Sequence, residues 1–214
     1  MLSHLNGPET DGSQRGEWNE HECTAMVKRI AEMPARPRAR LTGVIYLLFF
    51  LTAISAEFFL PGRNLVVYRD AANLISIVCY IAVTLLFYDM FRPVNRSLSL
   101  VAALFSLLGC AVLLLRLFDP SAYSISSNLF FGPYCLLIGY LIFRSTFLPQ
   151  ILGVLMALAG LGWLIFLLPP LVNHMSSYIE GLGIVAEGSL MLWLLIVGVD
   201  VHKWEEKAQR LASP

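Results

Sequence analysis

The sequence predicts an all-α polytopic membrane protein, a bundle of six transmembrane helices. Of its 214 residues, 57% are hydrophobic and 14% are charged, whereas soluble domains contain about 45–50% apolar and about 25% charged residues. The mean hydropathy is +0.68, and the apolar residues gather in runs of about twenty, the length that crosses a hydrocarbon core. This composition excludes a soluble enzyme, a disordered chain, a disulfide-rich scaffold and a nucleic-acid-binding protein.

The segment before the first apolar run, residues 1–39, is polar and rich in Gly, Pro and charge. It has no apolar periodicity, so we expect a disordered cytoplasmic tail. Acids outnumber bases in residues 1–25, whereas five bases stand in residues 26–40. The transmembrane domain is expected over residues 40–200, and residues 201–214 form a cytoplasmic C-terminal tail that continues the last helix.

Six apolar segments make up this domain, and each can span a core ~30 Å thick at 1.5 Å per residue. In chain order they are Leu41–Leu60, Ala71–Phe91, Leu98–Phe118, Ile125–Phe143, Phe147–Leu168 and Ile179–Val199.

Proline, glycine and capping residues set the ends of the first three segments. Pro61-Gly62 stops the first, and Pro93 follows the second, because proline cannot continue a helix. Ser97 is the expected N-cap of the third, since its hydroxyl can accept a hydrogen bond from a free N–H of the first turn.

Prolines also mark the later segments. Pro133, together with Asn128, makes the start of the fourth irregular. Pro149 falls in the first turn of the fifth, where proline is tolerated. Pro169-Pro170 ends the fifth segment, and the sixth follows after a short connection.

Lysine and arginine in the short connections predict the orientation. The even-numbered connections and both ends carry most of these bases: the block before the first span, Arg92, Arg96, Arg144, Lys203, Lys207 and Arg210. The opposite connections carry only Arg63 and Arg69. We therefore expect both termini to be cytoplasmic.

An alternative interpretation concerns the first apolar segment. If translation starts at Met33, the bases before Leu41 form a short n-region, and Ala53-Ile54-Ser55 resembles the cleavage site of a signal peptide. Five spans would then remain. The run stays apolar through Leu60 and reaches spanning length, which favours a transmembrane helix.

Ionisable residues inside the spans predict the functional site, because a charge at this depth is costly unless it is paired or hydrated. By residue rise, Glu57 lies ~5 Å and Arg116 ~3 Å from the outer ends of their helices, and Glu187 lies ~12 Å deep. Tyr134 and Asn128 lie in the outer half of the fourth span. These five residues predict a polar pocket that opens outward, with Glu187 as its principal site.

Two structural interpretations compete with a pocket. A salt bridge between Arg116 and either Glu57 or Glu187 would fix the helix register, and Glu57 and Arg116 could also snorkel to the interface. Glu187 is too deep to snorkel easily, so it must be protonated, paired or hydrated.

Other polar and aromatic residues have ordinary explanations. Asp89 can pair with Arg92 or with Arg144. Tyr46 and Trp163 are interpreted as interface anchors, in common with Tyr88, Tyr140, Trp193 and Trp204. Three of the four cysteines lie in apolar runs and are interpreted as buried filler.

Small residues predict where helices pack closely. Gly132 and Gly139 share one face of the fourth span. The fifth span carries Gly153, Ala157 and the run from Ala159 to Gly162. Helix contacts in membranes use such residues, and packing within one bundle explains them more simply than a dimer motif does.

The sequence supports no metal site and no cofactor. HExxH, GxSxG and P-loop motifs are absent. The four histidines, His4, His21, His174 and His202, lie outside the expected spans, which argues against haem ligation in the bundle.

Several stretches resemble one family. Arg92–Leu98 opens the third span, Gly139–Ser145 leads into Phe147–Val154, Ala56-Glu57-Phe58-Phe59 lies in the first span, and Glu187 precedes Leu192–Leu195. Together they resemble the bacterial membrane proteins of domain of unknown function 4386, over about residues 38–200. The resemblance implies a six-helix protein of the bacterial plasma membrane and no assigned activity. Glu57 and Glu187 match the family pattern. That pattern often has an arginine where this chain has Ser106, so Arg116 would be a relocated partner.

We therefore expect a non-enzymatic protein of the lipid bilayer that binds a small amphiphile, a lipid or a membrane partner through the pocket at Glu187, Glu57 and Arg116. An intramembrane enzyme acting on a lipid-like substrate is one alternative, with Glu187 as general acid or base. A small proton-coupled carrier is the other. Spacing alone does not place the acids in one cavity or give the oligomeric state.

Overall fold

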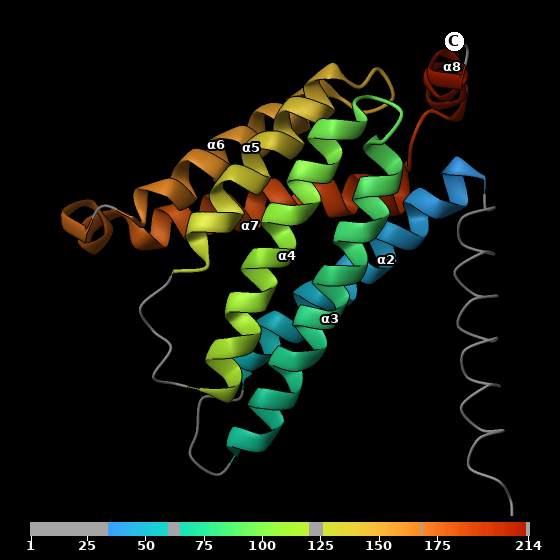
Figure 1. Cartoon of the computed structure of the whole chain (residues 1–214). Coiled ribbons are helices and arrows are strands. Elements are labelled where there is room, and N and C mark those ends of the chain that lie inside the picture. The colour runs from blue at the N-terminus through green and yellow to red at the C-terminus, as the bar shows by residue number, and fades with distance from the viewer. Residues whose placement is uncertain (1–33, 60–64, 120–125, 168, 213–214) are drawn as a thin grey trace, which may run out of the picture. The chain divides into compact units, whose positions relative to one another are not determined.

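The computed structural model describes residues 34–59, 65–119, 126–167 and 169–212, and these ranges contain helices and no strands. Within them the helices are α2 (Ala35–Ile54), the π-helical turn η1 (Ser55–Phe59), α3 (Val66–Phe91), α4 (Arg96–Phe118), α5 (Asn128–Arg144), α6 (Gln150–Ile165), α7 (Pro169–Ile196) and α8 (Val201–Ala212). All of them belong to one compact unit, residues 35–214 (Figure 1).

The predicted all-α fold is confirmed. Four helical stretches are long and apolar enough to cross a membrane, namely Ala35–Glu57, Val66–Phe91, Arg96–Phe118 and Met175–Ile196. The remaining two helices of the apolar bundle, α5 and α6, are also apolar but have only 17 and 16 residues. These helices make the chain a membrane protein by length and composition.

The helices α2 to α7 form a ring in sequence order. Each packs on the next one along the chain, and α2 packs on α7 to close the ring. Because successive helices run in opposite directions (Figure 1), two ends can be defined. The "η1 end" holds η1, the start of α3 and the end of α4; the "α8 end" holds the start of α2, the end of α3 and α8.

The first helix begins six residues before the expected Leu41. Ala35, Arg38 and Ala39 are buried against the other helices, so the start of α2 is part of the packed domain rather than of a polar tail. Residues 1–33 of the predicted tail lie outside the described residues.

The expected N-cap of α4 was two residues too late. Asn95 is the N-cap, with an extended backbone and a side-chain oxygen that accepts the Leu98 N–H at 3.0 Å. Both Asn and Ser are good caps. Asn95 follows the turn after α3 directly, so the helix starts there and Ser97 falls inside its first turn.

The last apolar helix is longer than expected and starts at Pro169. The two prolines follow α6 and also begin α7, which is allowed because the first turn of a helix needs no N–H donors. The expected connection over Pro169–Tyr178, with His174, is therefore helical.

The C-terminal segment forms a separate helix rather than a continuation of α7. Gly198 has a φ of +79°, a conformation that glycine adopts without strain, and it turns the chain into α8. Trp204 Nε1 donates to the carbonyl of Met90 at 3.0 Å, and Lys207 Nζ donates to the carbonyl of Arg144 at 2.6 Å. These bonds hold α8 against the ends of α3 and α5.

The small residues predicted to pack closely on the fourth and fifth spans do so within the chain, and they pack against each other. A Cβ added to Gly139 would lie 2.7 Å from the carbonyl oxygen of Gly153, and one added to Gly153 would lie equally close to that of Gly139. Gly132 and Gly160 form a second such contact, where a Cβ on Gly160 would lie 2.8 Å from the Gly132 oxygen. The backbones of α5 and α6 touch at both places.

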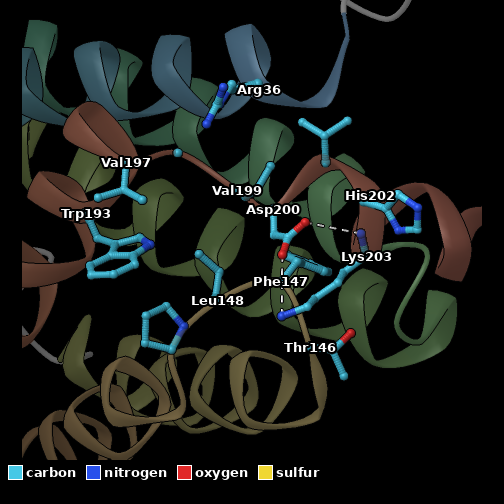
Figure 2. Close-up of a pocket in the computed structure, with 13 residues that line it drawn as sticks. Arg36, Thr146, Phe147, Leu148, Trp193, Val197, Val199, Asp200, His202 and Lys203 are labelled. Carbon is cyan, nitrogen blue, oxygen red and sulfur yellow. Dashed lines mark hydrogen bonds and ion pairs between the residues drawn. The ribbon is translucent and has the colours of Figure 1, made fainter.

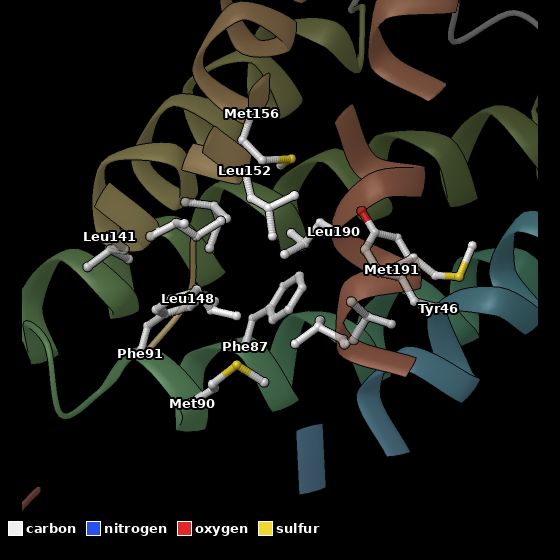
Figure 3. Packing of buried hydrophobic residues seen from close by; sticks show 14 of the residues in the cluster. Tyr46, Phe87, Met90, Phe91, Leu141, Leu148, Leu152, Met156, Leu190 and Met191 are labelled. Carbon is white, nitrogen blue, oxygen red and sulfur yellow. The ribbon is translucent and has the colours of Figure 1, made fainter. Parts of the chain in front are cut away.

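An aromatic and aliphatic core fills the interior between the helices (Figure 3). Phe87 and Phe91 of α3 are fully buried, and Phe91 stacks on Phe147 with ring centroids 6.0 Å apart. Leu190 of α7 and Met156 of α6 are also fully buried. Residues of α3, α6 and α7 and of the connection between α5 and α6 thus share one core.

A half-buried ion pair joins α2 to α3. Arg38 bonds Asp89, and its guanidinium carbon also lies 5.8 Å from the ring centroid of Trp204. The expected partners of Asp89, Arg92 and Arg144, were wrong, because the ring order brings the start of α2 to the end of α3. Sequence spacing does not give this order.

Candidate functional site

Glu187 lies in the middle of α7 and faces the interior of the ring. Tyr46 of α2 donates its hydroxyl to Glu187 Oε2 at 2.6 Å, and Cys135 Sγ of α5 lies 4.0 Å from Glu187 Oε1. The carboxylate is half-buried, whereas Tyr46 and Cys135 are fully buried. A deep carboxylate therefore has a hydroxyl partner and no basic one in the described part of the chain.

A cluster of aromatic rings surrounds this bond. Tyr46 packs against Phe49, Phe50 and Tyr80 with centroid distances of 5.5–6.1 Å. Tyr80 also packs against Tyr134, whose hydroxyl is buried and makes no hydrogen bond among the described residues.

Glu57 lies in η1, where α2 widens into a π-helical turn. At the first residue of this turn, Ser55 Oγ donates to the carbonyl of Leu51 at 2.6 Å, and in α2 before it Thr52 Oγ1 donates to the carbonyl of Leu48 at 2.8 Å. Such hydroxyl contacts bend helices, and π-helical turns occur frequently at functional sites. Glu57 is exposed and forms no ion pair with another described residue.

Two adjoining cavities connect Glu57 with Glu187. The "lateral cavity", of about 340 Å³, lies between α2 and α7 and is closed on one side by Trp163. The "central cavity", of about 390 Å³, extends from the same residues to Tyr80 and Asn128. Glu57, Glu187 and Trp163 line both, so the two predicted acids face a common space.

A third cavity continues toward the η1 end. This "mouth cavity", of about 520 Å³, shares Glu57 and Asn73 with the central cavity and is lined at its far side by Arg69, Asp70 and Arg116. Glu57 thus stands where all three cavities meet.

The structure brings together the predicted site residues to different degrees. Glu187 and Asn128 line the central cavity and Arg116 lines the mouth cavity, with Glu57 common to both. Tyr134 is behind this wall, packed on Tyr80. Neither predicted salt bridge of Arg116 forms among the described residues, since Glu187 bonds Tyr46 instead.

Ser106, where the family resemblance led us to expect an arginine, is not among the residues that line these cavities. Its hydroxyl is buried and is 2.6 Å from Thr84 Oγ1 on α3. Arg116 is ten residues further along α4, about 15 Å at helical rise, so it does not occupy the place of a side chain at Ser106.

Tyr46 and Trp163 are site residues that the sequence alone did not predict. Both were interpreted as interface anchors, but Tyr46 is fully buried and bonds Glu187, and Trp163 packs beside Gly183 at the cavity wall. A Cβ on Gly183 would lie 2.7 Å from the Trp163 ring. The signal available in the sequence was a glycine one turn before Glu187.

The largest of these cavities, about 640 Å³, lies at the α8 end (Figure 2). Neither Glu57 nor Glu187 lines it. Arg36, Asp200 and Lys203 line it over an apolar floor that includes Phe147 and Trp193. Lys203 Nζ lies 3.4 Å from Asp200 Oδ2, and the Lys203 backbone N–H bonds the same carboxylate, which lowers the pKa of Asp200. The charges of Asp200 and Lys203 at this cavity are therefore exposed and paired with each other.

No group of three His, Cys, Asp or Glu side chains that could hold a metal ion occurs among the described residues. The arrangement at Glu187 instead offers two carboxylates, a tyrosine hydroxyl and aromatic rings, which suit the binding of a small molecule.

Comparison with known proteins identifies one family. The family model described as "Domain of unknown function (DUF4386)" matches residues 62–127 and 113–198. An uncharacterized protein of Archaeoglobus fulgidus is 28% identical over 155 residues, which cover 68% of this chain and 93% of that relative. No solved structure matches significantly.

Proposed function

The chain belongs to the family of domain of unknown function 4386, and we propose that it is a non-enzymatic membrane protein that binds a small amphiphile or lipid. The observation that carries this proposal is the shared space between Glu57 and Glu187. Two acids at different depths line one set of cavities, and the deeper one has no basic partner among the described residues. A structural salt bridge would not need that space.

The lining of the cavities is suited to an amphiphile. The lateral cavity is mostly apolar, and exposed Ile54 and Ile184 stand at its edge between α2 and α7. An acyl or alkyl chain can therefore leave the cavity between these helices while a polar headgroup stays near the carboxylates. Ligand sites combine a mainly apolar lining with a few polar groups in this way.

The proposal includes a six-span topology with both termini in the cytoplasm of a bacterial cell and the mouth cavity facing outward. The α8 end carries most of the basic residues, including Arg36, Arg92, Arg96, Arg144 and Lys203, whereas Arg69 and Arg116 stand at the η1 end. This asymmetry supports a cytoplasmic α8 end. At about 24 Å, the 16-residue α6 can still cross where the bilayer thins locally.

Native mass spectrometry of the protein, extracted gently from its own membrane, tests the proposal. We expect a stoichiometric adduct in the wild type and its loss in Glu187→Gln, because the substitution removes the deeper carboxylate that lines both cavities. Glu205→Gln on the exposed face of α8 is the matched control and keeps the adduct. A bare wild-type protein, or an adduct that Glu187→Gln retains, would contradict the proposal.

A proton-coupled carrier is the second candidate, favoured by one observation. Glu57 and Glu187 stand on one continuous route with the Tyr46 hydroxyl bonded to the deeper acid, and carboxylates in series are typical of proton relays. A proton flux assay in liposomes separates the two, because a binder gives no flux that depends on Glu187.

A further inference from the structure

We propose that the ligand of the lateral and central cavities is an organic cation, an alkylammonium amphiphile whose headgroup lies between Glu57 and Glu187. This inference rests on the proposed function and adds the charge class of the ligand. Its basis is the joint occurrence of unpaired carboxylates and aromatic rings around the same two cavities.

The charge around these cavities has one sign. Glu57, Glu180 and Glu187 line the lateral cavity, and the first and last of them also line the central one. No lysine, arginine or histidine is among the residues that line either. An ionised carboxylate in an apolar setting is costly without a counter-charge, and a bound cation would supply that charge.

The basic residues of the region lie elsewhere. Arg69 and Arg116 line only the mouth cavity, where Asp70 lies beside Arg69 at 3.7 Å. An anionic headgroup would therefore find its partners at the mouth, whereas a cationic one would find them deeper, at Glu187.

The aromatic rings supply the second part of a cation site. Phe49 lines both cavities. Its ring centroid lies 5.4 Å from that of Phe50 and 4.7 Å from that of Tyr80. The ring centroids of Tyr80 and Phe131 are 5.4 Å apart. Trp163 closes the opposite side. Ring faces attract ammonium groups, and aromatic residues with acids are the usual way in which proteins hold quaternary ammonium ligands.

The shape favours an organic cation over a metal ion. Cavities of about 340 and 390 Å³ hold a headgroup with several carbons. Hard metal ions prefer several oxygen ligands at short distance, whereas most of the residues that line these cavities are apolar or aromatic.

The test uses the full chain in nanodiscs and decyltrimethylammonium as the probe, followed by titration calorimetry. Decanol and decyl sulfate, with the same chain length and a neutral or negative headgroup, are the comparison probes. We expect saturable 1:1 binding of the cation, weakened at least tenfold in Glu187→Gln and roughly 2- to 30-fold in Phe49→Leu, the range that cation–π energies give. Glu205→Gln leaves the affinity unchanged.

The outcomes separate this inference from the proposed function. If decanol or decyl sulfate binds as tightly as the cation and Glu187→Gln weakens them equally, the binding function stands and the cationic ligand is wrong. If sodium chloride at constant ionic strength displaces the probe where a salt of a larger cation does not, the site holds a metal ion. If no probe binds and native mass spectrometry finds no adduct, both proposals fail. Glu57→Gln, at an exposed position, repeats the test where Glu187→Gln fails to fold.

Discussion

Adding a methyl group where the backbones of α5 and α6 touch is expected to destabilise the domain. In Gly153→Ala, the new Cβ would lie 2.7 Å from the Gly139 carbonyl oxygen and 3.0 Å from the Phe143 nitrogen. Both are backbone atoms, so no rotamer change can relieve the overlap. Ordinary contact begins at 3.4 Å, so the helices must separate by about 0.7 Å.

The size of the effect follows from that displacement. A radial gap of 0.5–1 Å forfeits a quarter to a half of the dispersion energy of the atoms it separates, and overpacked cores usually cost 1–3 kcal/mol. We therefore expect Gly153→Ala to lower the free energy of unfolding by about 1–3 kcal/mol. The double variant with Gly139→Ala should cost less than the sum, because the first methyl group already opens the contact.

The assay is reversible unfolding in mixed micelles, followed by circular dichroism. Gly181→Ala in α7 is the matched control, since a Cβ there meets no atom within 4 Å, and it should be neutral or gain up to about 1 kcal/mol of helix stability. If Gly153→Ala is as stable as Gly181→Ala, the close contact of the two backbones does not exist in the membrane protein.

Three further predictions concern polar contacts. Asp89→Asn should lower the unfolding free energy by about 1–3 kcal/mol in the same assay, because it removes a carboxylate charge from beside the buried guanidinium of Arg38. Asp70→Asn, which breaks an exposed pair, should cost under about 1 kcal/mol. A double-mutant cycle of Tyr46→Phe and Glu187→Gln should give a coupling energy of about 1–2 kcal/mol from unfolding data, and a value near zero would contradict the hydrogen bond. The lowered pKa of Asp200 means that its contribution to stability is complete above the ordinary aspartate pKa and is lost as the pH falls through the lower, folded value; Asp200→Asn should therefore flatten the acid limb of a thermal-stability profile, and an unchanged limb would remove this role.

Much of the fold could be predicted because hydrophobic length is a direct constraint on membrane helices. The ends of α3 and α4, Phe91 and Phe118, fall where the sequence predicts them. The starts of α2 and α7 lie earlier in the chain than predicted, at Ala35 and Pro169. The charge of Arg38 led to its assignment to the polar tail, although it is buried at the start of α2. Pro169 was predicted to end the preceding helix, although proline is also a favourable first residue of a helix.

The candidate site could be predicted in part for the same reason. Glu187 and Glu57 stand out because acids in apolar runs are costly, and the structure gives them a common cavity. Tyr46 was missed because a helix starting at Leu41 puts it near the interface, whereas a start at Ala35 puts it about three turns into the helix and deep in the ring. The contact of Asp89 with Arg38 depends on which helices are neighbours, and periodicity does not contain that information.

The closure of the ring between its first and last helices has a consequence for biosynthesis. Tyr46 and Glu187 are 141 residues apart, so at 5–20 residues per second the ribosome needs roughly 7–28 s to supply the second after the first. Through that interval α2 waits in the membrane without α7, and its Tyr46 hydroxyl has no carboxylate to bond. The cavities at Glu187 therefore come into existence only at the end of translation, and a nascent chain stalled before α7 exposes on α2 a surface that a chaperone or protease of the membrane can recognise.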